Sequence, residues 1–119
     1  MKSDTGMAAD AMREILERIN GLDICTERKR EDKYCEVVFH AKDLRCWNSL
    51  FTELIGPASK PAKAKPTEEQ TCMTSKYGGI YQGQTLFSRE YDDGTIIAMF
   101  WPWQDAGYTT LKVAFIEGA

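Results

Sequence analysis

Residues 91–101, YDDGTIIAMFW, combine the clearest turn signal of this chain with its most apolar segment. Asp92, Asp93 and Gly94 are typical of the tight turn of a β-hairpin, because Asp and Gly tolerate the backbone conformations that such turns require. The segment that follows, residues 95–101, is apolar on both faces of a strand. A strand of this kind is expected inside a sheet that is covered on both sides. One cover would be helical, and the other would be a partner subunit or would be replaced by an apolar groove.

Four further strands are predicted around this segment. Residues 80–91 lead into the turn, and residues 108–117 alternate between inward apolar and outward polar side chains. Upstream, residues 22–27 and 34–40 predict a second hairpin with a fully charged tip. Residues 71–75 could form a further short strand.

The register of the upstream hairpin depends on the length of its loop. A four-residue loop, residues 28–31, places the apolar side chains of both strands on one face. These side chains are Leu22, Ile24, Cys35, Val37 and Phe39. A five-residue loop divides that face and places Cys25 opposite Cys35. The apolar pattern favours the four-residue loop.

Apolar side chains recur at helical spacing in residues 7–20 and in residues 43–55. Asp4 or Thr5 is a suitable N-cap for the first helix, and Asp43 is suitable for the second. Residues 56–70, GPASKPAKAKPTEEQ, follow with prolines, lysines and no large apolar residue. This composition predicts a flexible loop.

The predicted elements follow one another in the order α-β-β-α-β-β-β within a single domain, residues 1–119. Strands joined by short turns form a mostly antiparallel sheet, and both helices must then pack on one face of it. The sequence therefore predicts an α+β fold of the two-layer sandwich type.

Composition and charge limit the classes of function. The chain is 43% apolar and 28% charged, as in ordinary globular proteins, and its net charge of −3 does not favour nucleic acid or anionic membranes. No apolar run is long enough to span a membrane, and residues 1–10 are unlike a secretory leader, so a cytoplasmic location is expected. The four cysteines lack the close pairs typical of zinc sites, and no metal or cofactor is expected.

The aromatic loop, residues 100–108, reads FWPWQDAGY and is the leading candidate for a binding site. Trp101 and Trp103 can stack on a flat ligand or fill a pocket in a partner. Asp105 would add a polar contact, and Tyr108 would close the far side. Trp101 is expected nearer the core and Trp103 nearer the solvent.

These features favour a binding or interaction module over an enzyme. The apolar sheet face and the aromatic loop would together hold another protein, including a second copy of the chain, or a small apolar ligand. Arg89, in the middle of its strand, could hold an anion at the same groove. The tryptophans could instead only cap the open end of the core.

Two alternatives rest on other residues. A thiol-dependent enzyme would use Cys46 or Cys35 as its nucleophile, with His40 as the base. Contact with nucleic acid would use the basic tip, residues 28–33, together with the lysines of residues 60–65. Acidic side chains neutralise that tip, and no aromatic ring lies among these lysines to stack a base, so nucleic acid is the weaker alternative.

Overall fold

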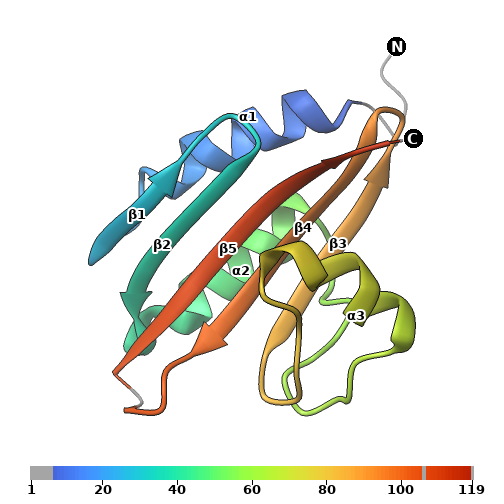
Figure 1. The fold of residues 1–119 in the computed structure, drawn as a ribbon. Coiled ribbons are helices and arrows are strands. Elements are labelled where there is room, and N and C mark those ends of the chain that lie inside the picture. Colours follow the sequence, from blue (N-terminus) through green and yellow to red (C-terminus); the bar gives the residue numbers. More distant parts are fainter. Residues whose placement is uncertain (1–6, 106, 119) are drawn as a thin grey trace.

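The computed structural model describes residues 7–105 and 107–118, which form an α+β fold around one five-stranded antiparallel sheet (Figure 1). The strand order is β1-β2-β5-β4-β3. The strands are β1 (Thr26–Arg30), β2 (Tyr34–His40), β3 (Thr85–Tyr91), β4 (Gly94–Pro102) and β5 (Tyr108–Glu117). The helices are α1 (Ala8–Ile19), α2 (Leu44–Leu54) and α3 (Glu68–Thr74), with short 3-10 turns η1 (Ala41–Asp43) and η2 (Ser75–Tyr77). The predicted class and the antiparallel sheet are confirmed.

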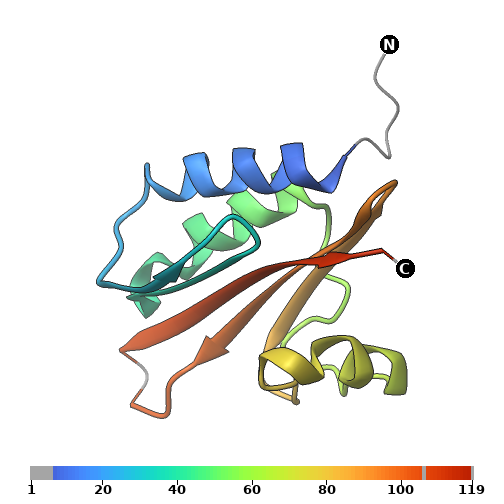
Figure 2. The same cartoon turned by 45° about the horizontal axis from the view of Figure 1, so that its top comes forward.

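Strand β4 is apolar toward both faces of the sheet, as the sequence predicts. Helices α1 and α2 lie together on one face, and α3 lies on the other (Figure 2). Ile96, Ala98 and Phe100 point into the core beneath α1 and α2. Ile97 and Met99 point into a second, smaller apolar cluster on the α3 side. The sheet is therefore covered on both faces where β4 crosses it.

Aromatic rings fill the core between the sheet and helix α2. The rings of Phe39 and Trp47 are stacked, with centroids 4.5 Å apart and an interplanar angle of 11°. Phe100 packs edge-on against Phe39 at 5.7 Å and against Phe51 at 5.9 Å. Aromatic pairs in such geometries add to the free energy gained by burial. Because they come from β2, β4 and α2, these rings fix the position of the helix across the sheet.

The N-terminus of α1 is capped from a distant turn. The predicted caps, Asp4 and Thr5, lie outside the described residues. The Asp93 carboxylate, in the turn between β3 and β4, accepts hydrogen bonds from the backbone N–H groups of Ala8 and, at 3.4 Å, Ala9. These N–H groups have no acceptor within the helix, because no helical turn precedes them. The hairpin turn therefore also holds the first helix.

The upstream hairpin departs from both predicted registers. Strand β1 begins later than predicted, contains a bulge, and pairs Arg30 with Cys35. Its charged side chains are tolerated because β1 is an edge strand with one side open to solvent. Leu22 and Ile24 still pack against the helix-side core, but they do so from the connection that precedes β1.

Three other local predictions are wrong. Residues 71–74 belong to α3 and Ser75 begins η2, so this segment is not a strand. Thr67 and Gln70 form a capping box that starts the helix. Residues 80–84 are not part of a strand and contain a turn, closed by a hydrogen bond from the Gln84 N–H to the Tyr81 carbonyl, so β3 begins later than predicted. Asp43 makes no side-chain cap hydrogen bond to α2, which is preceded by the turn η1.

Residues 56–67 connect α2 to α3 along the outer edge of β3. The backbones of Lys60 and Leu86 exchange two hydrogen bonds, of 3.1 and 3.0 Å. The Lys60 side chain is 1% exposed, and its Nζ donates to the carbonyl oxygens of Gln84 and, at 3.1 Å, Pro61. Burial lowers the pKa of Lys60. The last three residues of the predicted loop, 56–70, belong to α3, and the flexibility of the rest stays a prediction.

The chain itself covers the second face of the sheet over β3, β4 and part of β5. We call residues 68–83 the α3 segment. Its Met73, Tyr77 and Ile80 form an apolar cluster with side chains of the sheet. Those side chains are Leu86, Ile97, Met99, Trp101, Ala114 and Ile116. The sequence had suggested a partner subunit or an open apolar groove on this face. The α3 segment of the chain itself covers it instead.

Candidate binding surface

Beyond the α3 segment, the same face of β2 and β5 carries polar and aromatic side chains. They alternate with the core residues of each strand, because successive side chains point to opposite faces. At one end of this strand pair, His40 pairs with Tyr108, and the surface there is aromatic. At the other end, Tyr34 pairs with Ala114, and a cleft opens beside η2.

The aromatic cluster consists of Arg28, His40, Trp103 and Tyr108. Trp103 donates two hydrogen bonds, from Nε1 to Thr110 Oγ1 at 2.8 Å and from its backbone N–H to the Tyr108 carbonyl at 2.9 Å. Its ring centre lies 5.1 Å from that of Tyr108 and 5.7 Å from the Arg28 guanidinium carbon. The rings of Tyr108 and His40 are 5.5 Å apart. Although Trp103 is 37% exposed, it is held in place by Arg28 on β1 and by Tyr108 and Thr110 on β5.

Trp101 lies between the aromatic cluster and the cleft, beneath the α3 segment. The Lys112 Nζ atom is 3.6 Å from the centre of the Trp101 ring and donates to the Tyr77 carbonyl at 2.9 Å. Burial lowers the pKa of Lys112. Gly78 passes over the same ring so closely that an added Cβ would lie 2.3 Å from it. The Trp101 Nε1 atom is buried without a hydrogen-bond partner in the described part of the chain.

The lysine-lined cleft beside η2 has a volume of about 690 Å³. Tyr34 and Tyr77 stack at its edge, with ring centroids 5.6 Å apart and an interplanar angle of 14°. The Tyr34 hydroxyl donates to Glu36 at 2.7 Å, and burial together with this hydrogen bond raises the pKa of Tyr34. Lys29, Lys33, Lys76 and Lys112 line the cleft.

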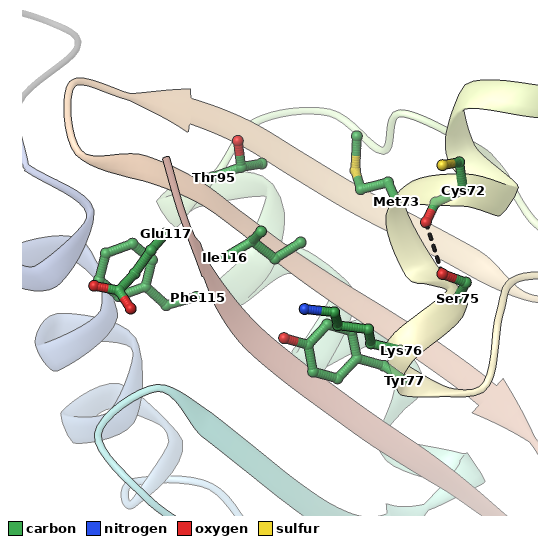
Figure 3. Close-up of a pocket in the computed structure, with 9 residues that line it drawn as sticks. All are labelled: Cys72, Met73, Ser75, Lys76, Tyr77, Thr95, Phe115, Ile116 and Glu117. Atoms are coloured by element: carbon green, nitrogen blue, oxygen red, sulfur yellow. Dashed lines mark hydrogen bonds between the residues drawn. The ribbon is translucent and has the colours of Figure 1, made fainter. Parts of the chain in front are cut away.

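A second cavity of about 470 Å³ lies on the other side of η2, toward the ends of β4 and β5 (Figure 3). Lys76 and Tyr77 line both cavities and extend from η2 over β5. Cys72 and Met73 line the second cavity from α3, and Ser75 Oγ donates to the Cys72 carbonyl at 3.0 Å. The turn η2 therefore forms a wall shared by two neighbouring cavities.

The aromatic loop, residues 100–108, is only partly assembled as predicted. Both tryptophans and Tyr108 lie on the α3 side of the sheet, and Trp101 is the more buried of the two tryptophans, as expected. Asp105 accepts a hydrogen bond from the Gly107 N–H at 3.0 Å and so stabilises the turn between β4 and β5. Ala106 lies outside the described residues.

Arg89 is separated from the other candidate residues. It pairs with Ile96, whose side chain is in the helix-side core, so Arg89 lies on the face opposite the aromatic cluster. Its guanidinium carbon is 5.4 Å from the centre of the Tyr91 ring. The expectation that Arg89 joins the aromatic loop at one groove is therefore wrong.

The thiols and the histidine are not arranged as a catalytic pair in the described chain. Cys35 is buried on the helix side and His40 is on the α3 side, because odd and even positions of β2 face opposite ways. Burial raises the pKa of Cys35, which disfavours the nucleophilic thiolate. Cys46 is exposed on α2, and no hydrogen bond between a thiol and His40 occurs among residues 7–105 and 107–118.

The two basic segments considered for nucleic acid lie at opposite edges of the sheet. The tip, residues 28–33, begins within β1, whereas residues 60–65 run beside β3. The basic side chains of β1 each have a carboxylate partner. These pairs are Arg28–Glu36 at 3.5 Å, Lys29–Glu31 at 3.6 Å and Arg30–Glu27 at 2.8 Å. Since Lys60 is also buried, the two segments do not form one basic arm.

Sequence patterns missed the residues that the α3 segment brings to this surface. The alternation in residues 108–117 correctly places Lys112 outward, but its contact with Tyr77 joins residues 35 positions apart. The stacking of Tyr34 on Tyr77 is equally non-local. No motif in either segment could have revealed these pairs.

Across the described ranges, none of the helices is both long and apolar enough to cross a bilayer. The same residues contain no group of three or more His, Cys, Asp or Glu side chains arranged to hold a metal ion. Neither a protein-family model nor a curated protein nor a solved structure matches this chain.

Proposed function

We propose that this chain is a protein-binding module and that the aromatic cluster is its contact surface. The observation that carries the proposal is Trp103, which is 37% exposed yet fixed by hydrogen bonds to Thr110 and Tyr108. An aromatic side chain that is already ordered loses little conformational entropy on binding. Trp, Tyr and Arg are also the residues that most often dominate the free energy of protein–protein binding.

A protein partner suits this surface better than a small apolar ligand does. Small molecules bind in concave sites, and the two cavities beside η2 are lined by residues outside the aromatic cluster. The cluster lies on the α3 side of the sheet, beyond the α3 segment, where a pocket in a partner can receive Trp103. Arg28, which is exposed at its border even though it pairs with Glu36 at 3.5 Å, favours a partner pocket edged by carboxylates.

Selection from a displayed library of random peptides tests this proposal. We expect the chain to select peptides with apolar and acidic residues, and Trp103→Ala to weaken their binding at least about tenfold. Tyr81→Ala is the matched control, because Tyr81 is 60% exposed in the α3 segment and lies outside the cluster. This control should bind the same peptides as the unmodified chain.

Two outcomes would overturn the proposal. One is the absence of any selected peptide, and the other is equal binding of the selected peptides by the Trp103→Ala variant. If the partner is a second copy of the chain, analytical sedimentation over a range of protein concentrations will detect a dimer. A dimer that dissociates on Trp103→Ala substitution, but not on Tyr81→Ala substitution, would support that case.

A further inference from the structure

The lysine-lined cleft gathers positive charge in a protein that is acidic as a whole. The chain has a net charge of −3, yet four lysines and only two glutamates line this cleft. The charges of both glutamates are already paired: Glu36 lies 3.5 Å from Arg28 and accepts from Tyr34, and Glu31 lies 3.6 Å from Lys29. The charge that remains toward the open cleft is therefore positive.

Lys76 and Lys112 are the cations best placed to meet a ligand. Lys76 is exposed on η2 and has no carboxylate partner within the described part of the chain. Lys112 is half-buried, and one of its N–H groups is used by the Tyr77 carbonyl at 2.9 Å. An ammonium group has three donors, so Lys112 keeps donors for a further acceptor. Lys33 lies 5.9 Å from the centre of the Phe115 ring, and its exposed ion pair with Glu117, at 2.9 Å, can be exchanged by a competing anion at little cost.

Beside these cations lie two flat rings and enough space for a small molecule. Tyr34 and Tyr77 are stacked and nearly parallel, and both line the cleft. Aromatic faces of this kind stack on the planar rings of ligands. The volume of about 690 Å³ lies within the range of small-molecule sites and is far larger than a bare inorganic anion requires.

We infer that this cleft is a second binding site, independent of the aromatic cluster, for a phosphate ester that carries a planar ring, such as a nucleoside monophosphate. Lys76, Lys112 and Lys33 hold the phosphate, since lysine acts as a point charge for phosphate oxygens. The tyrosine pair receives the ring. Because the cleft has a cationic part and an aromatic part, we expect an anion alone or a ring alone to bind more weakly than a ligand that carries both.

Calorimetric titration at low salt with AMP, inorganic phosphate and adenosine tests the inference. We expect AMP to bind at least about tenfold more tightly than either part alone, and its affinity to fall as salt is added. Lys76→Gln should weaken AMP binding by about tenfold, and Lys112→Gln should do the same. Lys63→Gln removes the same charge from an exposed position beside β3 and should leave the affinity unchanged.

A circular-dichroism spectrum of each variant shows whether its fold is retained, and Lys76→Gln alone suffices if Lys112→Gln unfolds. Equal affinities of Lys76→Gln and Lys63→Gln for AMP would overturn the inference, as would the absence of saturable binding. A short single-stranded RNA that binds while AMP does not would replace the small ligand with nucleic acid and so also overturn it. Trp103→Ala should bind AMP normally, so this site and the aromatic cluster can fail separately.

Discussion

The Asp93 carboxylate and the Ala8 backbone N–H form a hydrogen bond between residues that are 85 positions apart. Asp93 belongs to the turn between β3 and β4, and Ala8 is the first residue of α1. A residue of this turn thus supplies the capping oxygen that a helix usually obtains from the residue before its first turn. The contact ties the N-terminal helix to the hairpin that forms one edge of the sheet.

Replacing Asp93 should weaken this link in a way that depends on pH. Its hydrogen bonds to Ala8 and Ala9 lower the pKa of Asp93, so the ionised form stabilises the folded chain above the unfolded value of about 3.9. That stabilisation is lost as the pH falls through the lower pKa that Asp93 has in the folded chain. Asp93→Ala should therefore lower Tm by a few degrees at neutral pH and by progressively less in acid.

Asp93→Asn is the control for this experiment. Asparagine keeps a capping oxygen and, with Gly94, suits the hairpin turn, but it does not titrate. Its Tm should fall less than that of Asp93→Ala at neutral pH. A constant difference in Tm between Asp93→Ala and the unmodified chain from pH 7 to acid would contradict the capping role of the carboxylate.

Gly78 should tolerate alanine worse than Gly83 does. Both glycines have a positive φ, of +99° and +97°, so alanine strains the backbone at each position by about 1–2 kcal/mol. A Cβ at Gly78 would also lie 2.3 Å from the Trp101 ring, whereas nothing lies within 4 Å at Gly83. Urea unfolding should show a further loss of about 1–3 kcal/mol for Gly78→Ala. Equal losses for the two variants would mean that the α3 segment is not packed on Trp101.

Lys60 is expected to make stability rise with pH in alkaline solution. Burial lowers its pKa, so between that value and about 10.4 the unfolded chain binds more protons than the folded chain. The free energy of unfolding should increase through this window relative to that of Lys60→Met, which cannot titrate. At neutral pH, Lys60→Met should lose about 1–3 kcal/mol, because the Gln84 and Pro61 carbonyls lose their donor.

The matched variant for this measurement is Lys63→Met, since Lys63 is exposed in the same segment. It should change the free energy of unfolding by less than about 0.5 kcal/mol. A Lys60→Met variant as stable as Lys63→Met at every pH would show that Lys60 does not hold the segment to β3.

Thiol labelling should divide the four cysteines into two groups. Cys25, Cys46 and Cys72 are exposed, whereas Cys35 is buried in the core and has a raised pKa. With a disulfide reagent at neutral pH, we expect three thiols to react in the native chain and Cys35 to react only on unfolding. In Cys35→Ser, unfolding should release no further thiol. A single native thiol that reacts far faster than free cysteine would instead favour the thiol-dependent enzyme.

Local patterns predicted the elements of this fold that repeat over several residues. Helical periodicity located α1 and α2, and the apolar faces of β4 indicated a covered interior strand. The capping box at Thr67 and Gln70 was the available signal for α3, whereas the composition of this stretch predicted a loop and suggested a strand after it. The register of β1 was missed because the charged residues of an edge strand resemble those of a loop.

The candidate site was predictable only in part. Trp103 and Tyr108 were identified from the density of aromatic residues, and Trp101 was correctly expected nearer the core. Arg89 was grouped with them in error, because strand parity alone does not show which face of the sheet each strand presents. Arg28 was considered only as part of a basic tip, although it lies against Trp103.

The sequence by itself determined the α+β class, the antiparallel hairpins and the two helices beneath the sheet, because those features depend on residue spacing within short segments. Only the tertiary structure decided what covers the second face, what caps α1 and which lysines line the cleft. Asp93 with Ala8, Lys112 with Tyr77, and Lys60 with Gln84 are 85, 35 and 24 positions apart. Such pairs form only when the whole chain packs, since packing brings the donor and acceptor of distant segments within hydrogen-bond distance.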